Sequence, residues 1–248
     1  MRVVAWNIRT GGGRRIVELG NQLEAWRPDV IALSEFRGTK PSQQLASRLG
    51  EMGFTSQLST ADPERPATNA LLLASRSPLR QLSPLRFVET PTRWLAASVV
   101  VTVPLVVGSM HVPNRVTGKK YTFHANVLSV AKAWQDAPGL LIGDTNSGLP
   151  GIDEESPAFN HQEAGWFEAL LAQGWTDVFR HLHGDERVYS WYSPNGRNGF
   201  RLDQAFANAQ LLPSVKNMRY EWGQSDKEDG RRDALSDHAA IILDFKPK

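Results

Sequence analysis

Cysteine is absent from the 248 residues of this chain. Its absence excludes a disulfide framework, a thiolate zinc site and a cysteine nucleophile, and it fits a reducing compartment, so we expect a cytoplasmic protein. Long apolar runs are absent too, since no segment approaches the roughly 20 apolar residues of a membrane-spanning helix. The first residues lack the long apolar centre of a signal peptide. We therefore expect no membrane segment and no membrane partner.

A large excess of one charge is also missing, because 28 basic and 26 acidic side chains leave a formal net charge of only +2. That excess is too small to predict a polyanionic partner, so any basic face must be local. No linker, low-complexity stretch or fixed-period repeat divides the sequence. At this length folding buries roughly 70–75% of the unfolded surface, so a sizeable core forms without cross-links. We predict a single domain over residues 1–248, and a monomer.

Short β-branched and aromatic runs predict strands, and apolar residues at helical spacing predict helices. Strands are expected at 2–8, 29–35, 54–58, 69–74, 95–103, 105–110, 140–143, 189–192, 200–206, 215–222 and 239–245, and helices at 14–26, 41–52, 119–135 and 163–172. We expect a tight hairpin at Val103-Pro104, a surface loop around His181 and His183, and a charged loop at 226–232. Helices between groups of strands favour two sheets packed face to face with helices outside.

The stretch Leu141 to Asn146 is the strongest local signal of function. Asp144 and Asn146 follow a buried run, and strand alternation would point both side chains one way. A carboxylate and an amide at a strand end suit the holding of a water beside a phosphate oxygen. A plain turn is the alternative, because Asp and Asn are common turn residues.

Other polar residues follow apolar runs in the same way. Each alone could be a turn residue, a solvated strand end or a satisfied core histidine. The positions are Asn7, Glu35, His111, Asp144 with Asn146, Asp203, and Asp237 with His238. In stacked sheets such strand ends converge on one rim. Carboxylates without thiolates favour a hard cation such as Mg²⁺ or Mn²⁺, and a His beside an Asp gives an oriented imidazole, so the set suits phosphate-ester hydrolysis.

The ordered set resembles the endonuclease/exonuclease/phosphatase superfamily, and within it exonuclease III-type apurinic/apyrimidinic endonucleases. The resemblance covers nearly the full length. It rests on Trp6-Asn7-Ile8, Pro28 to Glu35, Gly143-Asp144-Thr145-Asn146, Arg201-Leu202-Asp203 and Ser236-Asp237-His238, with Gly174 to His181 and Tyr189 to Tyr192 similar to the repair branch. It implies a four-layer αββα sandwich, in agreement with the expected elements.

The resemblance also implies roles for individual residues. Glu35 is similar to the main metal ligand, with Asn7 and Asp237 close to the metal. Asp144 is similar to the residue that activates the attacking water, and Asn146 to its orienting partner and a phosphate donor. His238, paired with Asp203, is similar to the imidazole that contacts the scissile phosphate.

The resemblance further implies a pocket for a base-free sugar. Trp191, Phe200 and Leu202 stand at its wall positions, and Tyr192 lies beside them. The alternative is that these side chains fill the core between the sheets, as aromatic strand residues usually do. We also assign Asn114 to substrate binding.

Two positions depart from the repair branch. His111 replaces a Tyr, and its segment 109–113 instead resembles the deoxyribonuclease I and phospholipase-like branches, where a His is the acid for the leaving oxygen. Arg9 replaces an Asn or Asp near the metal, so it is either a phosphate ligand or a surface charge. Both changes leave the substrate open.

The sequence therefore predicts a Mg²⁺- or Mn²⁺-dependent phosphodiesterase on duplex DNA, cutting 5′ of abasic sites in base-excision repair, with 3′–5′ exonuclease activity as an open possibility. The alternatives are a deoxyribonuclease I-like nuclease, or an esterase for phospholipid, inositol phosphate or RNA. A non-catalytic DNA-binding domain is disfavoured because no essential carboxylate is missing. His181 and His183 have no partner cluster that would suggest zinc.

Overall fold

The computed structural model describes residues 1–82, 87–101, 104–195, 197–223 and 235–246. The expected charged loop at 226–232 lies outside these ranges, as does Val103 of the expected hairpin. Within them no helix is both long and apolar enough to cross a membrane.

The first sheet contains both ends of the described chain. Its six strands have the order β13-β14-β1-β2-β4-β3, in which only β1 and β2 pair in parallel. The strands are β1 (Arg2–Asn7), β2 (Val30–Phe36), β3 (Ser56–Ser59), β4 (Ala70–Ser75), β13 (Val215–Glu221) and β14 (Ala240–Phe245).

The second sheet has the order β5-β6-β7-β8-β12-β9, in which β7 and β8 pair in parallel and the other neighbours are antiparallel. Its strands are β5 (Leu79–Gln81), β6 (Trp94–Val99), β7 (Leu105–His111), β8 (Gly139–Asp144), β9 (Trp175–Asp177) and β12 (Asp203–Asn208). A separate hairpin pairs β10 (Trp191–Tyr192) with β11 (Gly199–Phe200).

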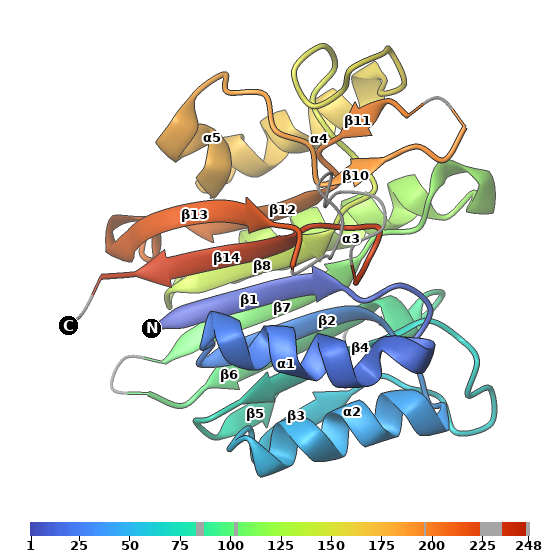
Figure 1. Ribbon diagram of the computed structural model, residues 1–248. Helices are drawn as coiled ribbons and strands as arrows, with labels where there is room; N and C mark the ends of the chain where they lie inside the picture. The colour runs from blue at the N-terminus through green and yellow to red at the C-terminus, as the bar shows by residue number, and fades with distance from the viewer. Residues whose placement is uncertain (83–86, 102–103, 196, 224–234, 247–248) are drawn as a thin grey trace.

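Three apolar clusters hold the layers together because side chains alternate across each strand. In β1, Val3 and Ala5 point into the core between the sheets, whereas Val4 and Trp6 pack against the helices outside. Figure 1 shows α1 and α2 in front of the first sheet, and Phe123 and Trp166 of the helices α3 and α4 pack on the outer face of the second. The four-layer αββα sandwich is confirmed. The helices are α1 (Ile16–Trp26), α2 (Lys40–Glu51), α3 (Lys120–Ala133), α4 (His161–Ala172) and α5 (Val178–His183), with 3₁₀ turns at Gly13–Arg15, Pro91–Arg93, Arg115–Thr117 and Leu212–Ser214.

The structure corrects three local predictions. His181 and His183 lie in the helix α5, not in a loop, because the side chain of Asp177 caps that helix by accepting from the N–H groups of Phe179 and Arg180. The expected strand 200–206 is broken after Phe200, since the main-chain N–H groups of residues 202 and 203 donate to Ser190 Oγ. The short strand β5 was not expected. Its three residues are too few to show a pattern.

Candidate active site

The predicted polar residues meet at one rim of the sandwich. The strands β1, β2, β7 and β8 end at this rim, and the antiparallel strands β12 and β14 begin near it. His111 stands opposite Asp144 in the ladder, and Asp144 stands opposite Asp203. A cavity of about 550 Å³ opens there, lined among others by Glu35, Asn114, Asn146, Asp237 and His238.

His238 and Asp203 form a buried pair. The Nδ1 atom of His238 lies 2.9 Å from Asp203 Oδ2, and Ser190 Oγ donates to the same oxygen at 2.7 Å. Burial alone would lower the pKa of His238, but the neighbouring carboxylates of Asp203 and Asp144 outweigh it and raise this pKa to about 10. His238 is therefore a cation at neutral pH, with its other nitrogen 4.0 Å from Asp144 Oδ2.

Asp144 has the properties of a general base. Burial raises its pKa to about 7, opposed by His238 and assisted by Asp203. Its Oδ1 accepts from the main-chain N–H of Asn146 at 2.9 Å, and its Oδ2 accepts from the amide of Asn7 at 3.0 Å across the two sheets. A carboxylate whose pKa lies near neutrality is well matched to proton abstraction from water.

Asn146 reaches Asp144 by a turn and not by strand alternation, which corrects the sequence argument. Asp144 is the last residue of β8, and Asn146 has a left-handed φ of 47°. Its side-chain Nδ2 donates to the carbonyl of Val112 at 2.8 Å, which fixes the amide at the cavity wall. Both residues line the same cavity.

His111 is buried at 5% exposure beside Asp144, with 3.5 Å between its Nε2 and Asp144 Oδ2. Burial, with the charges of Arg93 and His238, holds the pKa of His111 well below its ordinary value. The imidazole is therefore neutral at physiological pH, and its protonated form would not titrate on the alkaline side. It is suited to hydrogen bonding, not to service as a cationic acid.

The three residues predicted near a metal, Glu35, Asp237 and Asn7, differ in what their side chains contact. Glu35 and Asp237 both line the cavity. Asn7 uses both ends of its amide, with Nδ2 on Asp144 and Oδ1 on the N–H of Arg9, so it orients its neighbours. The available donors are carboxylate oxygens without sulfur, which fits a hard divalent cation.

A second set of metal-type donors converges in the described part of the chain. It consists of Asp144, Asp203 and His238, whose donor atoms lie within 4.8 Å of one another. The His238–Asp203 hydrogen bond already occupies one oxygen of this set. Glu35 and Asp237 also line the cavity and are less buried than this set.

The apolar wall of the cavity comes from the β10–β11 hairpin. Trp191, Phe200 and Leu202 line the cavity, and the rings of Trp191 and Phe200 lie 5.9 Å apart. Trp191 also faces the ring of His238, 6.3 Å away. These side chains are not fillers between the two main sheets. They bring an apolar surface next to the hydrolytic residues.

Two predicted substrate contacts lie outside this cavity wall. Tyr192 packs against Tyr189 and Trp222 instead, because it points to the opposite side of the hairpin from Trp191. The side chain of Arg9 is 55% exposed and lies 3.9 Å from Asp237.

Several lining residues escaped the sequence analysis, and three of them are cations. Arg93 precedes β6, is largely desolvated, and donates to the carbonyl of His111 at 3.4 Å. Lys120 is 2% exposed and pairs with the buried Glu163, while also donating to the carbonyl of Asn146. Arg115 lines the cavity too. The sequence carried one usable signal, the Asn160-to-Glu163 capping box that begins α4 and places Glu163.

Phe159 is a further lining residue that the sequence analysis missed. Its ring meets Phe200 edge-on at 5.8 Å. The buried carboxylate of Glu154 accepts from the N–H groups of Ala158 and Phe159, at 2.6 and 2.7 Å, and so holds the loop in place. The apolar pocket is thereby enclosed from two separate segments.

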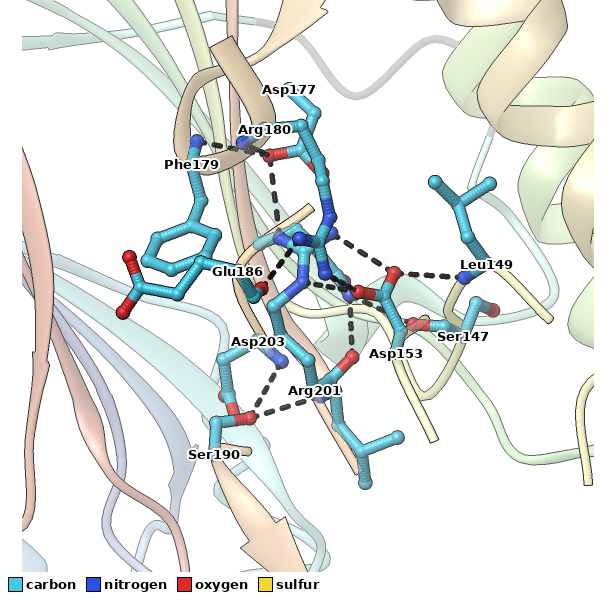
Figure 2. A network of polar contacts seen from close by, with 12 residues as sticks. Ser147, Leu149, Asp153, Asp177, Phe179, Arg180, Glu186, Ser190, Arg201 and Asp203 are labelled. Atoms are coloured by element: carbon cyan, nitrogen blue, oxygen red, sulfur yellow. Dashed lines mark hydrogen bonds and ion pairs between the residues drawn. The ribbon is translucent and has the colours of Figure 1, made fainter. Parts of the chain in front are cut away.

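A buried ionic network supports the wall from behind. Figure 2 shows Arg201 between Asp153 and Asp177, with Nε 2.7 Å from Asp153 Oδ1 and Nη2 2.6 Å from Asp177 Oδ2. Arg180 completes the network through Asp153. Removing one member of such a set costs about 3–5 kcal/mol, because the partner charge is left buried. The network therefore fixes the break between β11 and β12, which carries Leu202.

The fold and this cavity define a class of protein, the sandwich hydrolases of phosphate esters. The family model for the endonuclease/exonuclease/phosphatase family matches residues 4–238, so the chain belongs to that family. An exodeoxyribonuclease of Streptococcus pneumoniae is 24% identical over 99% of both chains. With these relatives and the site together, the chain is an enzyme of the nuclease, phosphodiester-hydrolase type.

Solved structures agree on the fold. An AP endonuclease from Archaeoglobus fulgidus superposes with a TM-score of 0.81 and 17% identity, covering all of both chains. A 3′ phosphatase from Neisseria, solved with a product DNA hairpin, gives a TM-score of 0.79 and 21% identity over 99% of both chains.

Proposed function

We propose that the protein is a Mg²⁺- or Mn²⁺-dependent nuclease that hydrolyses duplex DNA on the 5′ side of abasic sites. The observation that carries this proposal is one cavity that joins Asp144 and His238 to an apolar pocket walled by Trp191, Phe200 and Leu202. A bare deoxyribose fits a narrow aromatic slot, and extruding it costs least because its base is already lost. The DNA hairpin in the Neisseria neighbour supports DNA as the partner.

In this proposal Asp144 takes a proton from the attacking water, whose oxygen then attacks phosphorus. The cationic His238, oriented by Asp203, donates a hydrogen bond to the phosphate oxygen on which charge develops. Asn146 and Arg93 hold the other phosphate oxygens. The P–O3′ bond breaks, which leaves a 3′ hydroxyl after protonation. A cation held by Glu35 and Asp237 would polarise the phosphoryl group and neutralise charge at the leaving oxygen.

A second candidate function is hydrolysis of a different phosphate ester by the same site. The observation favouring it is His111, whose neutral imidazole stands where the repair branch has a tyrosine. This candidate keeps every role above except that of the apolar pocket.

Cleavage of a duplex with one abasic site, with Mg²⁺ and with chelator, tests the proposal directly. The sharper test compares Phe200→Ala on this duplex and on a small phosphodiester. We expect cleavage of the abasic duplex to fall by about tenfold more than cleavage of the small substrate, since burying a Phe side chain against an apolar surface is worth about 1.5–3 kcal/mol. Equal losses on both substrates, with a lower Tm, would mean that Phe200 is structural and would favour the second candidate.

A further inference from the structure

Five consecutive residues in front of α1 have a left-handed backbone. The φ angles of Arg9, Thr10, Gly11, Gly12 and Gly13 lie between 51° and 76°. Two of them are not glycine, and each such residue costs about 1–3 kcal/mol of strain, which usually persists only where the surroundings impose it. A purpose for this loop should therefore be visible in its contacts.

The N–H groups of the loop point at the rim residues. Arg9 N donates to Asn7 Oδ1 at 3.0 Å, and Thr10 N donates to Glu35 Oε2 at 2.6 Å. Gly11 N donates to the main-chain carbonyl of Glu35 at 2.8 Å. Successive N–H groups of this kind form a concavity that binds anions. Here the Thr10 N–H reaches the carboxylate of Glu35, and the N–H groups on either side of it hold the Asn7 amide oxygen and the main-chain carbonyl of Glu35.

Glu35 is itself held in an unusual conformation. Its φ is 57°, and the pairing of β2 with β4 shifts register between Ser34 and Phe36, so Glu35 is the extra residue of a β-bulge. Bulges next to active sites re-aim a side chain. Both the bulge and the loop therefore act on the same carboxylate.

The loop is anchored from two sides. Arg15 donates to the carbonyls of Ile8 and Arg9, at 3.2 and 2.7 Å, and to the carbonyl of Leu235, which lies just before Asp237. Ser42 of α2, fully buried, donates to the carbonyl of Gly11 at 2.9 Å. A side chain at position 11 would collide with this anchor, because its Cβ would lie 2.8 Å from Ser42 Oγ.

We propose that the loop Arg9–Gly13 is a main-chain cradle that fixes Glu35 as a one-oxygen metal ligand. The proposal rests on the assignment of Glu35 to the metal under the proposed function. The Thr10 N–H engages Oε2, which leaves Oε1 as the coordinating atom. Ca²⁺ commonly takes both oxygens of a carboxylate, whereas Mg²⁺ demands compact octahedral geometry. The cradle should therefore favour Mg²⁺ over Ca²⁺.

Metal affinity of the full chain, without substrate, tests the cradle. Bound Mn²⁺ is measured by electron paramagnetic resonance, and Mg²⁺ and Ca²⁺ affinities by competition. Gly11→Ala should weaken Mg²⁺ binding by about 10–100-fold, the usual effect of losing a contact to a metal ligand. Ca²⁺ binding should weaken less, so the Mg²⁺/Ca²⁺ preference falls. Ser42→Ala should also weaken Mg²⁺ binding and lower the Mg²⁺/Ca²⁺ preference, by a smaller factor. This variant tests the cradle if Gly11→Ala does not fold.

Gly174→Ala is the matched control. Gly174 has a φ of 79°, close to the 73° of Gly11, but it lies after α4 with open space around its Cβ position. It should lose similar backbone stability without any change in metal affinity. If Gly11→Ala and Ser42→Ala bind metals as Gly174→Ala does, the cradle is overturned and the proposed function stands. If Glu35→Gln binds metals normally, the assignment of Glu35 to the metal fails and the cradle fails with it, while cleavage of the abasic duplex still tests the proposed function.

Discussion

The active rim has two halves that are built in opposite ways. The buried half consists of His111, Asp144, Asp203 and His238, none of them more than 6% exposed. The open half consists of Glu35, Asp237 and Arg9, where the side chains of Asp237 and Arg9 are 36% and 55% exposed. The buried half is linked by side-chain hydrogen bonds, whereas the carboxylate of Glu35 in the open half accepts from the main-chain N–H of Thr10.

The difference in burial separates two chemical tasks. In the buried half, burial raises the pKa of Asp144. The nearby carboxylates raise the pKa of His238, because their charges are poorly screened by solvent there. These shifts prepare a base and a cation before substrate arrives. In the open half, solvent can reach the side chains, so a cation held by the proposed ligands could exchange with the solution. Rigidity there must come from the backbone, because exposed side-chain pairs hold geometry weakly.

The largest effect should come from breaking the buried half at Asp144. The Asp144→Asn variant keeps the shape and loses the base, so kcat should fall by about 10²–10⁴-fold, the usual worth of general-base assistance. Metal affinity should fall far less than the rate, because Glu35 and Asp237, the proposed ligands, are untouched. Single-turnover kinetics with a parallel Mn²⁺ titration measures both. A loss of DNA binding equal to the loss of rate would move Asp144 to a structural role.

A smaller effect is expected behind the buried half, at Ser190. Its hydroxyl donates to Asp203 Oδ2 and accepts from the N–H groups of Leu202 and Asp203. Ser190→Ala should lower kcat by about tenfold with KM nearly constant, since a hydrogen bond to a charged group is worth about 1.5–3 kcal/mol. It should also raise the pKa of His238, because the Asp203 carboxylate that loses a donor attracts the imidazolium more strongly.

Ser75→Ala is the control for Ser190. Ser75 is equally buried and accepts from the N–H of Ser77, but it lies at the far end of β4. It should lose stability without a change in kcat or in the pKa of His238. If the two variants differ only in Tm, Ser190 merely supports the fold.

The pH profile probes the two shifted groups of the buried half together. Asp144 must be ionised to act, so the rate should rise with pH through about 7, and His238 must be protonated, so the rate should fall through about 10. In Asp144→Asn the acid limb should disappear. A bound cation favours the ionised carboxylate, so the acid limb should also move to lower pH as Mg²⁺ is raised. An acid limb that is present and unmoved in Asp144→Asn would contradict the assignment.

The sequence predicts the residues of both halves far better than the other cations that line the cavity. Asp144, Asp203 and His238 each follow or begin a strongly apolar strand, so alternation and strand direction bring them to one rim. Arg93 and Lys120 carry no such pattern. Their place depends on how the segments before β6 and α3 fold over the rim, which is a matter of tertiary packing.

The left-handed loop illustrates the same limit. The three glycines at positions 11–13 are typical of a break between elements. Nothing local predicts that Arg9 and Thr10 also adopt positive φ, because their conformation is imposed by Glu35, 25 residues further along the chain from Thr10. The short helix α5 was not predicted for a simpler reason, since its six residues cannot show helical periodicity.

The smallest effect on rate is expected at His111, the residue that best separates the two candidate substrates. Its neutral imidazole offers one hydrogen bond toward Asp144 and the phosphate, and such a bond is worth about 0.5–1.5 kcal/mol, or roughly two- to tenfold in rate. His111→Ala should lose this amount. His111→Tyr should recover part of it through the phenolic hydroxyl and should shift preference toward abasic duplex, as the repair branch implies. Because the pKa of His111 is lowered, neither variant should move the alkaline limb of the pH profile. If the alkaline limb vanishes in His111→Ala, His111 is the proton donor to the leaving oxygen. If both variants have the wild-type rate, His111 is only a packing residue.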